Sequence, residues 1–131
     1  MFRITPIQSK DEQRAAALAC GVEFIEGYFA YSMKDAESGK LMGFSQFDIQ
    51  ANEGYISNIV LVPGLVDFEA QFILGRATMS FIDTCGAHIA RASGKTASRD
   101  FLLALGFEEL EPGEYLADMT NFFNGKCHEN I

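Results

Sequence analysis

The sequence predicts an α/β (α+β) protein built on one mixed, mostly antiparallel twisted sheet with helices on both faces. Three strand-like segments follow one another in residues 27–62, separated only by turn-rich breaks at 35–40 and 50–54. Such a meander pairs antiparallel. The segments at 57–62 and 87–92 are instead separated by a helix-like run, which predicts one β-α-β unit. The expected order of elements is β-α-β-β-β-α-β-α-β-β.

The N-terminal part of the chain predicts a strand followed by a helix. Residues 1–7 alternate apolar and polar side chains, and the strand is expected to end at Pro6. Ser9 is placed to cap a helix that runs over residues 10–21 and closes at Gly21.

The period of the apolar residues changes after Pro63 and predicts a long amphipathic helix that Gly86 closes. Its apolar positions recur at spacings of three and four: Phe68, Phe72, Gly75, Met79 and Ile82. Gly75 lies too deep in this helix for a loop and predicts a close packing contact. Cys85 is expected in the core of the helix.

The C-terminal third predicts alternating short elements. Residues 87–92 form a strand, and residues 98–107 form a short helix stopped by Gly106. Residues 107–119 form two strands around a Pro-Gly turn, and residues 120–125 form a single helical turn. No linker interrupts this pattern, so residues 1–131 are expected to form one domain.

Composition narrows the classes of function. The chain has 131 residues, 48% hydrophobic and 21% charged, a balance typical of a single globular domain. It contains no apolar run of about 20 residues, and its N-terminal residues lack the apolar core of a secretory signal, which predicts a cytoplasmic protein. The net charge of −8 argues against nucleic acid and anionic membranes as partners and favours cationic ligands such as amines.

The cysteines do not predict a disulfide framework or a metal site. Cys20, Cys85 and Cys127 are widely spaced, odd in number and outside any CxxC pair. Cys127 and His128 could supply two adjacent ligands, but no second pair accompanies them. We therefore expect free thiols and no metal.

Three motifs resemble the GNAT superfamily of acyl-CoA-dependent N-acetyltransferases. They are "GKLMGFSQFDI" at residues 39–49, "IVLVP" at 59–63 and "LLALGF" at 102–107, and they occur in the family's order. The resemblance covers nearly the whole chain. It implies a GNAT-like fold, acetyl-CoA as cofactor, and transfer of an acetyl group to a small-molecule amine.

The resemblance also implies where acetyl-CoA would bind. In GNAT proteins the fourth and fifth strands splay apart, and the exposed strand edge pairs with the pantetheine arm. The backbone of Ile59 and Leu61 stands at that edge. The backbone amides of Glu69, Ala70, Gln71 and Phe72, at the start of the long helix, would face the cofactor's phosphates. The apolar residues of this strand are equally compatible with an ordinary buried parallel strand.

The pyrophosphate-binding loop departs from the family pattern (R/Q)-x-x-G-x-(G/A). Val66 falls at the Arg/Gln position, Glu69 at the first glycine and Gln71 at the second small residue. Asp67 is instead placed as the N-cap of the long helix, with Glu69 as a first-turn acid, so the helix start is expected to be neutralised by its own side chains. This degenerate loop leaves an alternative open: a catalytically inactive GNAT-like binding or interaction module.

The catalytic positions depart as well. Leu102 stands where the family usually carries a tyrosine general acid, and Lys95 lies near the position of an asparagine that contacts CoA. Glu53, Tyr55 and Tyr115 are the candidate substitutes, since a carboxylate can accept a proton and a phenol can donate one. Each is also explained as a solvated polar residue of a strand.

The C-terminal region suggests one further interaction. Phe122 and Phe123, if exposed, would form an apolar patch across which a homodimer could pack.

Overall fold

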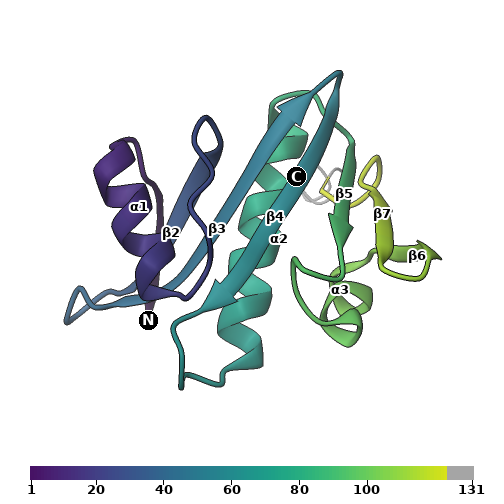
Figure 1. Cartoon of the computed structure of the whole chain (residues 1–131). Coiled ribbons are helices and arrows are strands. Elements are labelled where there is room, and N and C mark those ends of the chain that lie inside the picture. The colour runs from purple at the N-terminus through teal and green to yellow at the C-terminus, as the bar shows by residue number, and fades with distance from the viewer. Residues whose placement is uncertain (124–131) are drawn as a thin grey trace, which may run out of the picture.

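A computed structural model describes residues 1–123, which form seven strands and three helices (Figure 1). The strands are β1 Phe2–Pro6, β2 Phe29–Asp35, β3 Leu41–Gln50, β4 Glu53–Leu61, β5 Ile89–Ser93, β6 Glu108–Glu111 and β7 Glu114–Asp118. The helices are α1 Lys10–Ala19, α2 Phe68–Thr84 and α3 Arg99–Leu105. This is the predicted order of elements.

The strands form one sheet in the order β1-β2-β3-β4-β5-β7-β6. All neighbouring strands pair antiparallel except β4 and β5, which are parallel because α2 crosses between them. In Figure 1, α1 lies in front of the sheet and α2 behind it. The predicted mixed, mostly antiparallel sheet with helices on both faces is confirmed.

The helix ends form where the sequence places its caps. The Ser9 hydroxyl accepts a hydrogen bond from the Glu12 amide at 3.2 Å, and the Asp67 carboxylate accepts one from the Ala70 amide at 3.0 Å. Gly106 ends α3 with a φ of 113°, a left-handed conformation that glycine adopts without strain. The predicted caps Ser9, Asp67 and Gly106 are confirmed.

Each face of the sheet has its own apolar core. The core beneath α1 contains Ile7, Ala16, Ala17, Cys20, Ala30 and Phe44. The larger core beneath α2 and α3 includes Met33, Phe47, Ile59, Leu74, Met79, Ile82 and Leu102. Successive residues of β3 serve opposite faces, as the period of two in a strand requires.

Gly75 makes the close packing contact that is predicted from its position within the helix, and its partner is Leu105. A Cβ atom at this position would lie 2.9 and 3.0 Å from the two terminal carbons of Leu105. Gly75 therefore lets α3 pack directly against α2.

Three expectations near the ends of elements are wrong or fall outside the described residues. Cys85 is exposed, because α2 ends at Thr84 and Cys85 is its C-cap. Residues 120–123 form a turn and bend rather than a helical turn, with a hydrogen bond of 3.0 Å from the Phe122 amide to the Met119 carbonyl. Cys127 and His128 lie outside residues 1–123.

Phe122 and Phe123 do not form the exposed patch on which the homodimer prediction depends. Both rings are partly buried against the larger core, and they contact each other at a centroid distance of 6.0 Å. Phe122 also lies beneath Arg76, whose guanidinium is 5.4 Å from the ring centroid.

Within residues 1–123, no helix is long and apolar enough to cross a membrane. The same residues contain no group of three or more His, Cys, Asp or Glu side chains arranged to hold a metal ion.

Candidate functional site at the β4–β5 opening

Strands β4 and β5 are paired over a short stretch and then separate. Residues 53–55 pair with residues 89–91, whereas β4 continues to Leu61 and β5 to Ser93. Figure 1 shows the two strands close together near their N-terminal ends and diverging toward the end where α2 begins. This is the separation of the fourth and fifth strands that the GNAT resemblance implies.

A β-bulge in β4 accounts for the divergence. Gln46 of β3 faces Asn58, and Phe47 faces Ile56, so that Ser57 has no partner opposite it. An extra residue bends the bulged strand and increases its local twist. Because the bulge directly follows the last pair with β5, it turns the remainder of β4 away from β5.

Thr96, in the loop after β5, fills the start of the opening. Its side chain is fully buried; the hydroxyl donates to the Ile56 carbonyl at 2.7 Å and accepts from the Ser93 amide at 3.0 Å. The Thr96 carbonyl accepts a hydrogen bond from the Ile59 amide at 3.2 Å. The loop thus supplies the partner that β5 no longer provides.

The Ile59 carbonyl is also engaged, since the Gln71 side-chain amide donates to it at 2.9 Å. Both backbone groups of Ile59 are therefore paired within the protein. Backbone groups of alternate residues in a strand point to the same side. Leu61, two residues further, consequently presents its amide and carbonyl to the opening as well.

The start of α2 holds the other predicted cofactor contacts. Asp67 accepts from the Ala70 amide through its side chain and from the Gln71 amide through its carbonyl, at 3.0 and 3.1 Å. Phe72 lies in the second turn, where its amide bonds within the helix. Among the described residues, only the amides of Phe68 and Glu69 in this first turn have no protein acceptor.

A cavity of about 470 Å³ adjoins these groups; it is lined by residues 60–68 and Gln71. Glu69 is exposed near it, and Asp67 contributes a second carboxylate. The groups named so far, namely Ile59, Leu61, Gln71 and residues 67–70, form what we call the α2 side of the opening.

A second cavity, of about 250 Å³, lies beside the bulge; we call it the Tyr55 side of the opening. Its polar lining consists of Tyr28, Tyr55, Ser57, Arg91 and Ser93. Tyr55 and Arg91 are paired residues of β4 and β5, and Tyr28 comes from the loop before β2. The cavity therefore gathers hydroxyl groups and a guanidinium from three separate segments.

Glu53 and Tyr55, two of the candidate catalytic residues, are brought together here. The Arg91 Nε atom lies 2.7 Å from a Glu53 carboxylate oxygen, and the Tyr55 hydroxyl donates to the same oxygen at 3.2 Å. The hydrogen bond from Arg91 lowers the pKa of Glu53 below its ordinary value. Glu53 is therefore ionised at neutral pH and is a weak proton acceptor.

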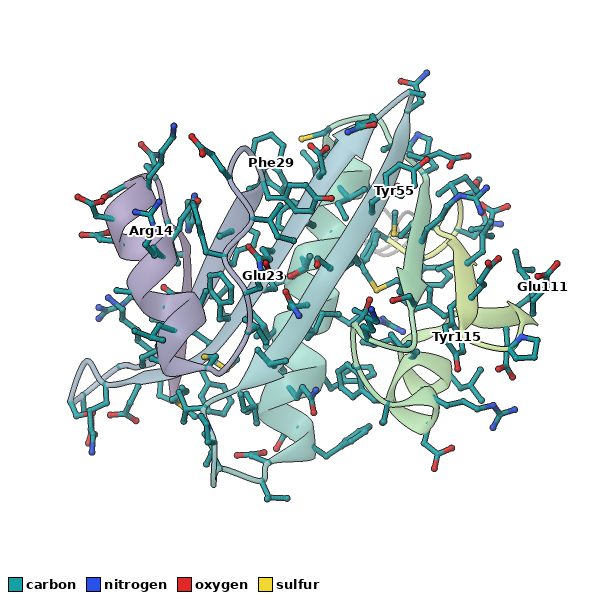
Figure 2. All side chains as sticks on the ribbon, in the orientation of Figure 1. Arg14, Glu23, Phe29, Tyr55, Glu111 and Tyr115 are labelled. Atoms are coloured by element: carbon teal, nitrogen blue, oxygen red, sulfur yellow. The ribbon has the colours of Figure 1, made fainter. Side chains whose placement is uncertain are left out.

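Tyr115, the third candidate, lies elsewhere (Figure 2). Its ring is buried, and its hydroxyl donates to Glu109 at 3.4 Å; Glu109 in turn accepts from Arg99 at 2.8 Å. Burial raises the pKa of Tyr115, so this phenol is a poorer acid than a free tyrosine. Leu102, at the position of the family's general acid, is fully buried in the core.

Gln46 is a residue of the site that the sequence analysis missed. It is buried, with 1% of its surface exposed, and its side-chain amide donates to the Glu23 carbonyl at 2.6 Å and to Asn58 at 2.8 Å. Its carbonyl oxygen accepts from the Ile25 amide at 3.2 Å. Gln46 thereby ties the loop that carries Tyr28 to the sheet. A glutamine inside an apolar strand is the one sequence signal that could have indicated it.

No protein-family model matches the sequence, and no curated protein matches it. Solved structures do match. The ribosomal-protein-S18-alanine N-acetyltransferase from Escherichia coli superimposes with a TM-score of 0.67 at 14% identity, covering 88% of this chain and 90% of that one. The IAA acetyltransferase from Bacillus cereus gives a TM-score of 0.69 at 16% identity over 85% and 79% of the two chains.

A GNAT family acetyltransferase from Brucella melitensis, solved in complex with acetyl-CoA, matches with a TM-score of 0.69 at 10% identity, over 90% of this chain and 88% of that one. Identities of this size establish the architecture and leave activity open. The chain therefore has the GNAT, acyl-CoA N-acyltransferase-like fold.

Proposed function

We propose that the protein is an N-acetyltransferase that moves an acetyl group from acetyl-CoA to a small amine at the β4–β5 opening. The observation that carries this proposal is the pair of cavities that follow one another along β4, one beside Tyr55 and one beside Gln71. A thioester held on the α2 side and an amine held on the Tyr55 side would meet near Ile59. The structural likeness to an acetyltransferase solved in complex with acetyl-CoA supports acetyl-CoA as the donor.

The reaction needs little from the protein beyond orientation and removal of a proton. The amine nitrogen forms a bond to the thioester carbon, the carbon–sulfur bond breaks, and an ammonium acceptor loses two protons, one of which ends on the thiol. We assign the Tyr55 hydroxyl, which lines the cavity, to orient the amine. Glu53 does not line the cavity and is paired with Arg91; its part is to hold the Tyr55 hydroxyl by accepting a hydrogen bond from it.

Acetyl-CoA would have to replace hydrogen bonds that the protein already makes. The Ile59 amide and carbonyl are bound to Thr96 and Gln71. Each bond to pantetheine would replace an existing bond of similar strength, so the exchange yields little net free energy. Asp67 and Glu69 would also repel the diphosphate, so we expect weak binding.

Isothermal titration with acetyl-CoA tests binding, and release of the CoA thiol on addition of amines tests transfer. The proposal expects saturable binding and thiol release that depends on the amine. Absence of binding at millimolar acetyl-CoA would refute it.

A second candidate function follows from the same hydrogen bonds. The Ile59 amide and carbonyl both have hydrogen-bond partners within the protein, and Asp67 caps α2. These contacts also support a binding or interaction module that has the GNAT fold and does not bind CoA. Micromolar, saturable acetyl-CoA binding together with amine-dependent thiol release would exclude this module.

A further inference from the structure

A third cavity, of about 410 Å³, lies beside the first residues of β2, next to the end of β1 at Pro6, and is separate from the opening. We call it the aromatic cavity. Its lining includes the rings of Phe29 and Tyr31 from β2, Phe47 from β3 and Phe81 from α2. Cavities of a few hundred Å³ with mainly apolar walls are the usual size and character of small-molecule sites. Nothing in the proposed acetyl transfer uses this cavity.

The four rings form one connected group. Phe47 and Phe81 contact each other at a centroid distance of 5.7 Å, and each also contacts both Phe29 and Tyr31 at distances of 5.7–6.0 Å. Phe29 nevertheless remains 47% exposed. Figure 2 shows its side chain next to β2. A large aromatic residue left half exposed beside a cavity has ring surface available to a ligand.

Gln13 supplies the cavity with a hydrogen-bond acceptor. Gln13 lines it and has only 8% of its surface exposed. The Gln13 side-chain nitrogen donates to the Ile7 carbonyl at 2.6 Å, which identifies the other terminal atom as the carbonyl oxygen. Among residues 1–123, no donor reaches that oxygen. No buried side-chain nitrogen or oxygen of residues 1–123 lacks a partner, so the Gln13 oxygen is reached by solvent, and an N–H or O–H group of a ligand can take the place of water there.

The charges of the cavity lining and of the whole protein indicate whether a ligand with such a donor should be a cation, neutral or an anion. The lining contains no Lys, Arg, Asp or Glu, so nothing in it would neutralise an anion. The protein as a whole carries a net charge of −8. The faces of aromatic rings are electronegative and attract organic cations, most strongly when water is excluded. Burial raises the pKa of Tyr31, which keeps its hydroxyl neutral.

We propose that the aromatic cavity binds a small organic ammonium ion, whose cationic group rests on the rings of Phe29, Tyr31 and Phe81 and donates a hydrogen bond to Gln13, while the buried Phe47 supports these rings from below. Tyr28 lines both this cavity and the Tyr55 side of the opening, so the two sites are neighbours. The site is independent of acetyl-CoA.

Three probes of nearly equal shape test the charge preference in the full-length protein without acetyl-CoA: phenethylammonium, 2-phenylethanol and phenylacetate. Isothermal titration should give saturable binding of the ammonium ion about fivefold or more tighter than that of the alcohol, with phenylacetate weakest. Equal binding of phenylacetate and phenethylammonium, or no binding of any probe at 10 mM, a concentration roughly at the millimolar limit of measurable affinity, would overturn the proposal.

Two variants locate the site. Phe29→Leu keeps an apolar side chain but removes the ring, and it should weaken phenethylammonium binding by about threefold or more, whereas Phe29→Tyr should retain it. Phe68→Leu is the matched control, because Phe68 is 57% exposed and lies outside the cavity. Equal effects of Phe29→Leu and Phe68→Leu would contradict the assignment. Because this readout is equilibrium binding, its outcome is independent of whether the protein transfers acetyl groups.

Discussion

The two sides of the β4–β5 opening differ in how much of their hydrogen-bonding capacity the protein itself uses. On the α2 side, both backbone groups of Ile59 and two amides at the start of α2 are already bound. On the Tyr55 side, Tyr55 and Arg91 are bonded to Glu53, but within residues 1–123 the side chains of Tyr28 and Ser57 have no protein partner. The acceptor side of the proposed reaction thus keeps free polar groups, while the donor side is held by internal contacts.

This difference indicates that the internal hydrogen bonds of the α2 side limit the affinity for acetyl-CoA. A ligand on the Tyr55 side adds hydrogen bonds, whereas a thioester on the α2 side exchanges existing ones. Thr96, Gln71 and Asp67 are therefore the residues whose alteration should change acetyl-CoA binding. Four predictions test this comparison, beginning with the largest expected effect.

Thr96→Val should lower the free energy of unfolding by about 2–4 kcal/mol, because the Ile56 carbonyl and the Ser93 amide lose their partner in a buried position. Chemical denaturation measures the change. Thr84→Val is the matched control: Thr84 is exposed, and its substitution should change stability by less than about 0.5 kcal/mol. Similar losses for both variants would mean that Thr96 does not hold the opening.

Gly54→Ala tests how tightly β4 is held where it still pairs with β5. A Cβ atom at Gly54 would lie 2.6 and 2.8 Å from Ile82 side-chain carbons, so we expect a loss of about 1–3 kcal/mol by overpacking. The double variant Gly54→Ala, Ile82→Val should recover part of this loss. If Ile82→Val instead lowers the free energy of unfolding further by as much as it does in the wild-type background, the contact between residue 54 and Ile82 does not limit packing.

Asp67→Asn should strengthen acetyl-CoA binding by about fivefold, because asparagine still caps α2 while the charge facing the diphosphate is removed. Isothermal titration at low and high salt measures the change, which should shrink as salt rises. Asp100→Asn, in the first turn of α3, is the control and should leave binding unchanged. An unchanged affinity in Asp67→Asn would show that the helix start does not oppose the cofactor.

Glu53→Gln should reduce stability by a small amount that depends on pH. Arg91 lowers the pKa of Glu53 in the folded state, so the ion pair stabilises the protein above the ordinary glutamate pKa of about 4.3 and the benefit is lost as pH falls through the lowered pKa. Thermal unfolding between about pH 3 and pH 7 should show the difference from wild type disappearing at the acid end. In an Arg91→Gln background the pH dependence of this difference should shrink, because only the hydrogen bond from Tyr55 then lowers the pKa of Glu53.

The framework of the site follows from local patterns in the sequence. Ser9, Asp67 and Gly106 mark helix ends through interactions within a few residues, and the turn-rich breaks at 35–40 and 50–54 separate strands that pair as neighbours. The contacts that close the opening are different in kind. Thr96 and Ile56 are 40 residues apart, and a threonine in a loop carries no local sign of such a partner.

The bulge at Ser57 is likewise not predictable, and Gln46 is marked only by its polarity within an apolar strand. A bulge is a property of how two strands align, and an extra residue in one strand is invisible in that strand alone. The prediction that Cys85 lies in the helix core is wrong because α2 ends at Thr84, one residue before it, and helix ends are uncertain by a residue or two in the sequence. Tyr55 and Tyr115 look equivalent in the sequence, and only the packing of α3 separates their surroundings.

Titration of the isotope-labelled protein with acetyl-CoA, followed through the backbone amide of Ile59 and the side-chain amide of Gln71, tests the central claim most directly. The account predicts saturable shifts of both signals, reached at lower acetyl-CoA concentration in Asp67→Asn than in wild type. If neither protein shows any shift of these two amides at millimolar acetyl-CoA, the α2 side of the opening is not a donor site.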